Sequence, residues 1–200
     1  MALLDAATVR EYIPSLTGTS EDSQLVSFIA RFNSLAAAYM GYPAPTVGGN
    51  PSLEVVTYTH HTNGEGTKFL HLPVVPTVAI TTAHVDSDRE YNSDDLVAAS
   101  DYTLYGDEGL LLLKVDSVQG EWDAGKRTVK VVYTAGFATT PMAIKHACAL
   151  QVAHWYAGRH HIGKTNVNQG GGSAALATLE LLPETKQALN PFRLPSSFLG

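Results

Sequence analysis

Apolar residues recur at helical spacing near both ends of the chain. In the first third they fall every three or four positions and stop before Gly41 and Pro43, which end a helix. The same spacing returns after Pro141. The two stripes consist of Leu25, Phe28, Ile29, Phe32, Leu35, Ala36 and Tyr39, and of Ile144, Cys148, Val152 and Trp155. Each stripe needs an apolar partner, so we expect these two helices to pack against each other.

Two shorter helices are predicted outside this pair. Residues 5–13 form a helix that Pro14 ends. Residues 183–188 form another, with Pro183 at the first helical position, where its missing N–H leaves nothing unpaired. The glycine run at 170–172 predicts a flexible break between the long second helix and this last one.

The middle of the chain alternates apolar and polar residues, which is the period of half-buried strands. Asn63-Gly64 is typical of a tight turn, so we expect the first two strands to form a hairpin. Gly106 and Gly109 flank the turn of a second hairpin, and 86–99 is a polar, acidic loop. The expected strands are 53–59, 68–75, 77–85, 102–105, 110–115 and a last one that starts at Val129.

These elements predict an α+β protein in two parts. A helical body is expected to come from both chain ends, residues 1–45 and 140–200, and to include a C-terminal arm. Residues 46–139 are expected to form a β-rich insertion between them. A chain of 200 residues is long enough to bury a core in one domain that carries such an insertion.

Charge and composition narrow the function. Residues 51–140 carry 13 acidic and 6 basic side chains, a net charge of −7, whereas sequence-specific binding of nucleic acid needs a basic surface. No apolar run approaches the roughly 18 residues that cross a bilayer, so no membrane partner is expected. The single Cys148 excludes an internal disulfide framework and predicts a buried core residue in a protein made in a reducing cytoplasm.

Catalytic and metal-binding patterns are missing from the sequence. His60 and His61 point to opposite faces of a strand, and His146 and His154 lie about 12 Å apart along a helix. No zinc-ligand spacing, phosphate loop or nucleophile motif occurs. We therefore expect no metal, no cofactor and no enzymatic activity. Aromatic side chains on strands leave open a small β-rich carbohydrate- or peptide-binding module.

The segment that starts at Val129, Val-Lys-Val-Val-Tyr-Thr-Ala-Gly-Phe, leads through Thr140-Pro141 into a helix that ends near Tyr156 and Arg159. This strand and helix resemble the head-to-tail connector (adaptor) proteins of tailed bacteriophages. Further segments resemble the same family in order along the chain, at 3–12, 21–42, 70–78, 101–110 and 182–193.

The resemblance implies a structural protein of the virion, located at the head–tail junction. Such a protein forms a dodecameric ring of identical subunits beneath the portal protein. It joins the portal to the next neck or tail protein and extends the DNA channel, through which DNA passes without specific binding. This role requires no catalysis.

Two groups of residues are candidates for contacts in such an assembly. Apolar residues of the C-terminal arm are too few to form a core of their own, so we expect them to dock on the portal or on an adjacent subunit; the alternative is an arm folded back on its own subunit. The hypothesised partner interface comprises Phe192, Arg193, Leu194, Phe198 and Leu199. Some of the acidic side chains are expected to face the channel, where like charge keeps DNA from sticking: Asp86, Asp88, Glu90, Asp94, Asp95, Asp107 and Glu108.

Overall fold

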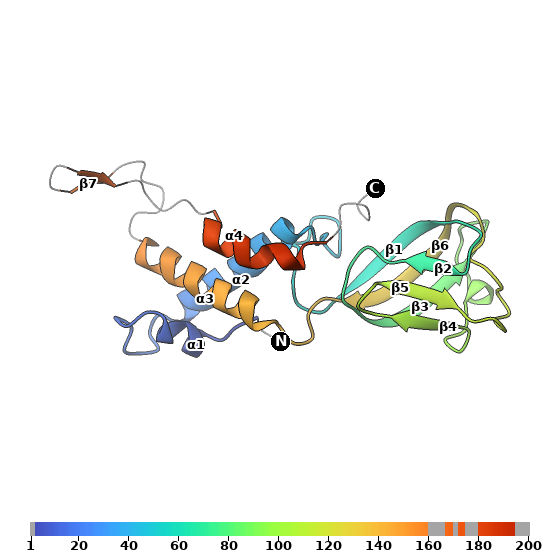
Figure 1. Cartoon of the computed structure of the whole chain (residues 1–200), viewed down its shortest axis with the longest axis horizontal. Helices are drawn as coiled ribbons and strands as arrows, with labels where there is room; N and C mark the ends of the chain where they lie inside the picture. The colour runs from blue at the N-terminus through green and yellow to red at the C-terminus, as the bar shows by residue number, and fades with distance from the viewer. Residues whose placement is uncertain (1–2, 160–166, 170–171, 175–179, 195–200) are drawn as a thin grey trace. The chain divides into compact units, whose positions relative to one another are not determined.

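The computed structural model describes residues 3–159, 167–169, 172–174 and 180–194 (Figure 1). The chain divides into two compact units. The helical unit consists of Met1–Met40 and Thr139–Arg193, and the β unit consists of Gly41–Ala138 and Leu194–Gly200. Each unit is described by itself.

The described residues of the helical unit form four α-helices: α1 (Ala6–Glu11), α2 (Asp22–Met40), α3 (Met142–Ala157) and α4 (Pro183–Leu189). The short 3-10 helix η3 (Asn190–Phe192) follows them. The predicted apolar stripes are confirmed, because Leu25 and Phe32 of α2 and Cys148 and Trp155 of α3 are buried. Helix α4 begins with Pro183, as predicted. The core of this unit therefore lies along α3, which contacts both α2 and α4.

Two three-stranded antiparallel sheets form the β unit. The first has the order β1 (Val56–Gly64), β6 (Gly125–Ala135), β3 (Thr77–Val85), and the second has the order β2 (Phe69–His71), β5 (Leu110–Leu113), β4 (Tyr102–Tyr105). The predicted hairpin of β4 and β5 is confirmed by their register. The short 3-10 helix η1 (Ser93–Asp95) lies in the loop after β3.

Alternation along β6 separates the core of the β unit from its surface. Val129, Val131 and Tyr133 are buried, whereas Lys130 between them is only half-buried. Tyr133 stacks on Tyr58 of β1, with ring centroids 5.7 Å apart. Period-two burial is what a sheet with one covered face requires.

The expected hairpin between the first two strands is wrong. Strand β1 pairs with β6, and Gly64 opposes Gly125 in that register. Asn63 and Gly64 serve a close approach of two backbones: the Asn63 amide oxygen accepts the Arg127 N–H at 2.9 Å, and a Cβ on Gly64 would collide with the Asp123 carbonyl. Glycine is favoured both in tight turns and where two backbones approach closely, so the sequence Asn-Gly does not distinguish these two structures.

The expected fold class also needs correction. Helices do not make up both chain ends: α1 has six residues and α4 seven, and the strand pair β7 (Val167–Gln169) and β8 (Gly172–Ala174) lies between α3 and α4. Strands are therefore not confined to the middle of the chain. The physical reason is composition, since the polar and glycine-rich sequence after α3 has low helix propensity. The molecule is a mixed α+β protein with a β-rich middle.

Candidate subunit and partner interfaces

An apolar groove lies between α1 and α3 in the helical unit, with a volume of about 400 Å³. Met142 at its edge is 75% exposed and Tyr12 is 38% exposed. The Tyr12 hydroxyl lies 3.1 Å from Nδ1 of His146, with the two rings edge to face. A groove that combines apolar side chains with a few polar ones can accept an apolar side chain of another protein. Its lining consists of Leu4, Thr8, Tyr12, Met142, Ala143, Lys145, His146 and Ala149.

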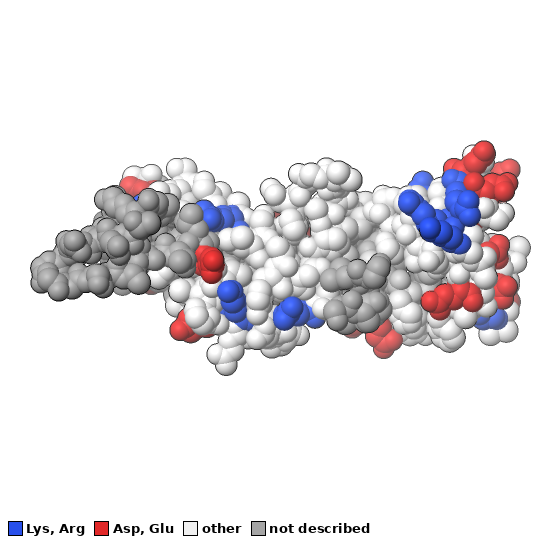
Figure 2. Space-filling model, turned by 90° about the horizontal axis from the view of Figure 1, so that it is seen from above, with Lys and Arg blue, Asp and Glu red and all other residues white. Residues whose placement is uncertain are grey.

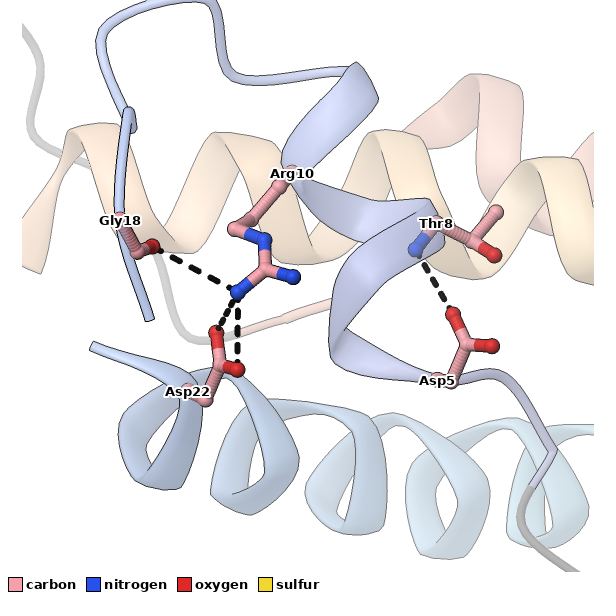
Figure 3. A network of polar contacts seen from close by, with 5 residues as sticks. All are labelled: Asp5, Thr8, Arg10, Gly18 and Asp22. Atoms are coloured by element: carbon pink, nitrogen blue, oxygen red, sulfur yellow. Dashed lines mark hydrogen bonds and ion pairs between the residues drawn. The ribbon is translucent and has the colours of Figure 1, made fainter. Parts of the chain in front are cut away.

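Polar contacts hold α1, one wall of this groove, in place (Figure 3). The Asp5 carboxylate caps the helix by accepting the Thr8 N–H at 2.7 Å. Hydrogen bonding to the Thr8 side chain, and then to its backbone, lowers the pKa of Asp5. Arg10 donates from Nη1 to both carboxylate oxygens of Asp22, at 2.6 and 2.8 Å. Arg10 thus links α1 to the start of α2.

A second apolar surface covers the outer face of the sheet β2–β5–β4. Phe69 is 54% exposed and opposes Leu112, while Tyr105 is 46% exposed and opposes Leu110. The run of leucines from 110 to 113 is the sequence signal for this face, because four consecutive apolar residues fill both sides of a strand. Alternation of apolar and polar residues predicts the strand but does not reveal that its second face is apolar too.

The seven acidic candidates do not form one surface. Asp107 and Glu108 are exposed on the turn between β4 and β5. This turn lies beside the start of β3, where the Gly106 carbonyl accepts the Thr77 N–H at 2.9 Å. The other five follow the end of β3. This nine-residue strand spans roughly 30 Å, so the structure places the two groups at opposite ends of the β unit.

Two of the acidic candidates have structural roles. Asp86 is 7% exposed, and its carboxylate accepts backbone N–H groups of three residues that follow it in the loop after β3. The hydrogen bond from Tyr91 is the largest cause of a lowered pKa at Asp86. Asp95 caps η1 by accepting the Asn92 N–H at 2.8 Å. The candidates that remain exposed are Asp88, Glu90, Asp94, Asp107 and Glu108.

Basic side chains also gather over the β unit, with acidic ones at their margin (Figure 2). Arg89 donates from Nε to the Lys126 carbonyl at 2.9 Å, and Arg127 and Lys130 follow on β6. The acidic middle of the chain thus presents a mixed surface. Net charge alone did not reveal this cluster, which arises because the loop after β3 folds onto the start of β6.

The C-terminal candidates fall into three groups. Leu194 is 8% exposed and is therefore covered by its own chain. Arg193 places its guanidinium 5.2 Å from the centre of the Tyr39 ring, and Phe192 is half-buried. Phe198 and Leu199 lie outside the described residues. The partner-interface hypothesis is left with Phe192 and Arg193 in the described part, together with Phe198 and Leu199.

The described residues contain no cluster of three histidine, cysteine or acidic side chains placed to hold a metal ion. Cys148 is buried, and burial raises the pKa of its thiol to about 12. A thiol of this kind is not a nucleophile at neutral pH. Among the helices in the described part of the chain, none has the length and apolar character needed to cross a membrane.

Three solved structures share this fold along almost the whole chain. A chain in the neck of an empty gene transfer agent particle with C6 symmetry is 18% identical, with a TM-score of 0.58, covering 96% of this chain and 90% of that chain. A chain in the virion of a native gene transfer agent particle is 18% identical, with a TM-score of 0.55, and the match covers 96% of this chain and 90% of that chain. A chain in the neck of a native gene transfer agent particle with C12 symmetry is 16% identical, with a TM-score of 0.54, and the match covers 95% of this chain and 88% of that chain.

No curated protein matches the sequence. The family model that describes head completion proteins matches residues 2–193. This match covers nearly all of the chain and confirms the expected class, a structural protein of the virion at the head–tail junction. Together the sequence pattern, the fold and this match establish that the chain belongs to the head completion protein family.

Proposed function

We propose that this protein forms a closed ring of identical subunits in the neck of a phage or phage-like particle. The observation that carries the proposal is the family match over residues 2–193. The fold shared with chains from necks of C6 and C12 symmetry supports a ring, and we propose twelve copies. The exposed apolar groove and the exposed apolar face of the sheet β2–β5–β4 support the proposal, because such surfaces are usually buried against neighbouring subunits in an assembly.

Within this ring we propose contacts with the portal protein on one side and with the next neck or tail protein on the other. Phe192, Arg193, Phe198 and Leu199 are the proposed anchors toward the portal or an adjacent subunit. The ring would extend the DNA channel, with some of the exposed acidic side chains at its wall or rim. Carboxylates repel the phosphate backbone, so DNA would pass without being held.

We also propose that the protein works without catalysis, metal or cofactor. Its task is to bind neighbours in a fixed geometry, which requires complementary surfaces on each subunit. The buried, protonated Cys148 is consistent with this role, because it offers no reactive thiol.

Electron microscopy of the purified protein, alone and mixed with its portal, tests the proposal. We expect rings of uniform diameter with a central channel, either free or on the portal. Image classes should reveal the number of subunits. A monomer that shows no affinity for the portal at micromolar concentration would overturn the proposed function. A ring with a different subunit number would correct only the proposed symmetry.

A further inference from the structure

Edge strands expose a row of unpaired backbone groups, to which a strand of another chain can add. Proteins usually protect such edges with short strands, charged side chains, proline or bulges. The two sheets of the β unit have four edges, and three of them carry one of these protections. Strands β2 and β4, which border the second sheet, have only three and four residues.

Strand β3, one border of the first sheet, is protected by bulges and by neighbouring loops. Its register with β6 shifts twice within residues 77–82. At its start the Thr77 N–H donates to the Gly106 carbonyl at 2.9 Å, and near its end the Ala83 carbonyl accepts the Val97 N–H at 2.8 Å. A further strand therefore cannot run along the full length of β3.

Strand β1, the other border of the first sheet, has none of these protections. Its nine residues, Val56–Gly64, include no Lys, Arg, Asp, Glu or Pro. Its register with β6 is continuous from Val56 to Thr62, and the single shift lies at its end. In the described part of the β unit, β1 is thus the one edge that is long, regular and free of these charged residues.

The middle strand β6 shows which backbone groups of β1 point away from the sheet. The Thr128 carbonyl accepts the N–H of Asp86, directly after β3, at 2.8 Å. The Gly136 N–H donates to the carbonyl of Pro76, directly before β3, at 2.9 Å. Backbone groups along a strand bond to its two neighbours in alternation, so the odd-numbered residues of β6 bond to β1.

The register with these odd-numbered residues leaves every second residue of β1 without a bond to β6. Tyr58 opposes Tyr133 and His60 opposes Val131, so these residues of β1 bond inward. No described residue forms a hydrogen bond with the outward backbone groups that alternate with them. The N–H and C=O groups that point outward belong to Thr57, Thr59 and His61, of which the first two are exposed residues.

The strand pair β7–β8 lacks a sheet to join. Its strands, Val167–Gln169 and Gly172–Ala174, pair only with each other within the part of the chain that the structure describes. An isolated pair of strands is marginally stable in water and needs a third strand or a packed surface. Neither strand carries a charged residue, so an added strand of this kind meets no repulsion at β1.

We propose that β1 accepts the strand pair β7–β8 of a second copy, which extends the first sheet through main-chain hydrogen bonds. The inference rests on the proposed ring and names one contact between its subunits. Donor and acceptor are different surfaces, so each copy gives a strand pair to one neighbour and accepts one from the other. Such a heterologous contact can close a ring, whereas pairing of β1 with β1 would be isologous and would stop at two copies.

Amide hydrogen exchange resolved to single residues, on the full-length protein as assembled rings and as free subunits, tests the proposal. The amides of Thr57, Thr59 and His61 should exchange more slowly in the ring by about tenfold or more, because the net contribution of one hydrogen bond corresponds to about a tenfold change in an equilibrium. The amides of Tyr58 and His60, which bond to β6 in both states, are the internal control.

Two exchange results would overturn the proposal. The first is unchanged exchange of the three outward amides in assembled rings. The second is protection that appears only after the portal is added, because it would assign the donor strand to the portal and not to a second copy.

Substitution of Thr59 tests the outward N–H directly. Thr59→Pro removes this donor and leaves the bonds from β1 to β6 in place, since edge strands accept proline where the N–H faces solvent. Compared with Thr59→Ala, which retains the N–H, it should raise the protein concentration at which rings form by about tenfold or more. Equal concentrations for the two variants would contradict the proposal.

Cross-linking decides the question if Thr59→Pro does not fold. A Thr59→Cys protein is mixed with an Asn168→Cys protein and treated with a short bis-maleimide, and the buried Cys148 does not compete. Linked pairs should form in this mixture but not when Gly18→Cys replaces Asn168→Cys. Absence of linked pairs in rings would overturn the proposal. So would a link that forms only within one chain of the double variant, since the strand pair would then join its own sheet.

Ring formation is scored separately by electron microscopy. Rings with unprotected outward amides on β1 would remove this contact and leave the proposed function in place. A protein that stays monomeric with and without the portal would overturn both.

Discussion

At the scale of single residues, burial decides which side chains matter for stability. Trp155 is 1% exposed and lies between Phe28, whose ring centroid is 6.1 Å away, and the guanidinium of Arg31 at 5.4 Å. Cys148, two helical turns earlier on the same helix, is completely buried. Both were predicted as core residues from their spacing, which shows that the helical period identified the inner face of α3 correctly.

Replacing Trp155 with alanine should lower the free energy of unfolding by about 3–5 kcal/mol, because the indole leaves a cavity that its neighbours cannot fill. Urea denaturation followed by circular dichroism measures the change. Leu150→Ala is the matched control on the same helix, since Leu150 is 42% exposed, and should change stability by about 0.5 kcal/mol or less. Equal effects of the two substitutions would contradict the assigned core.

Cys148 should resist thiol reagents in the native protein. Its pKa of about 12 leaves almost no thiolate at pH 8, and burial blocks access. Reaction with Ellman's reagent should be slow without denaturant and complete within minutes in guanidinium chloride. Rapid reaction of the native protein would show that α3 opens frequently or that the thiol is accessible.

At the scale of secondary-structure elements, long-range pairing determined what local signals could not. The stripes of α2 and α3 and the hairpin of β4 and β5 were predictable because each depends on residues close in sequence. The partner of β1 was not, since β6 lies more than 60 residues further along the chain. Asn63-Gly64 fits a turn locally, and only the pairing with β6 shows that it serves a close approach of two backbones.

Substitution of Gly64 by alanine should destabilise the β unit by about 1–3 kcal/mol, because the new Cβ would collide with the Asp123 carbonyl and force the backbone to shift. Thermal unfolding reports the effect. Gly18→Ala is the control, since no atom lies within 4 Å of a Cβ at that position. If Gly64→Ala is as stable as Gly18→Ala, the close approach of β1 to the segment before β6 is incorrect.

At the scale of the whole molecule, interfaces depend on surfaces that sequence patterns identify only in part. The hypothesis for the C-terminal arm named five residues, and the structure covers one of them, Leu194, with the chain itself. Arg193 is held over Tyr39, whose hydroxyl donates to Asn190 at 2.6 Å. The end of the helical unit is thus anchored up to Arg193, and the residues beyond Leu194 are the part to remove in a test.

A protein truncated after Leu194 should fold normally and fail to attach to the portal, because it retains the contacts of Tyr39 but lacks Phe198 and Leu199. Circular dichroism checks the fold, and co-sedimentation with portal checks attachment. The double substitution Phe198→Ala with Leu199→Ala should reproduce the loss, whereas Ser196→Ala with Ser197→Ala should not. Normal attachment by the truncated protein would remove the proposed role of these residues.

The candidate sites show the same division between local and long-range information. The acidic residues were visible in the sequence, but only the fold shows that Asp86 stabilises a loop and that Asp107 and Glu108 lie at the other end of the β unit. The groove between α1 and α3 could not be predicted, because its walls come from helices separated by more than 130 residues. Clusters formed by distant segments have no signature in local periodicity.

By itself the sequence determined the inner faces of α2 and α3, the β4–β5 hairpin, the burial of Cys148 and the family resemblance, because periodicity and ordered motifs act over short distances along the chain. The tertiary structure alone decided that β1 pairs with β6 and borders the first sheet, and that a strand pair follows α3. Strand pairing brings together residues that are far apart in sequence. Their contact energies are therefore determined only when the whole chain has folded.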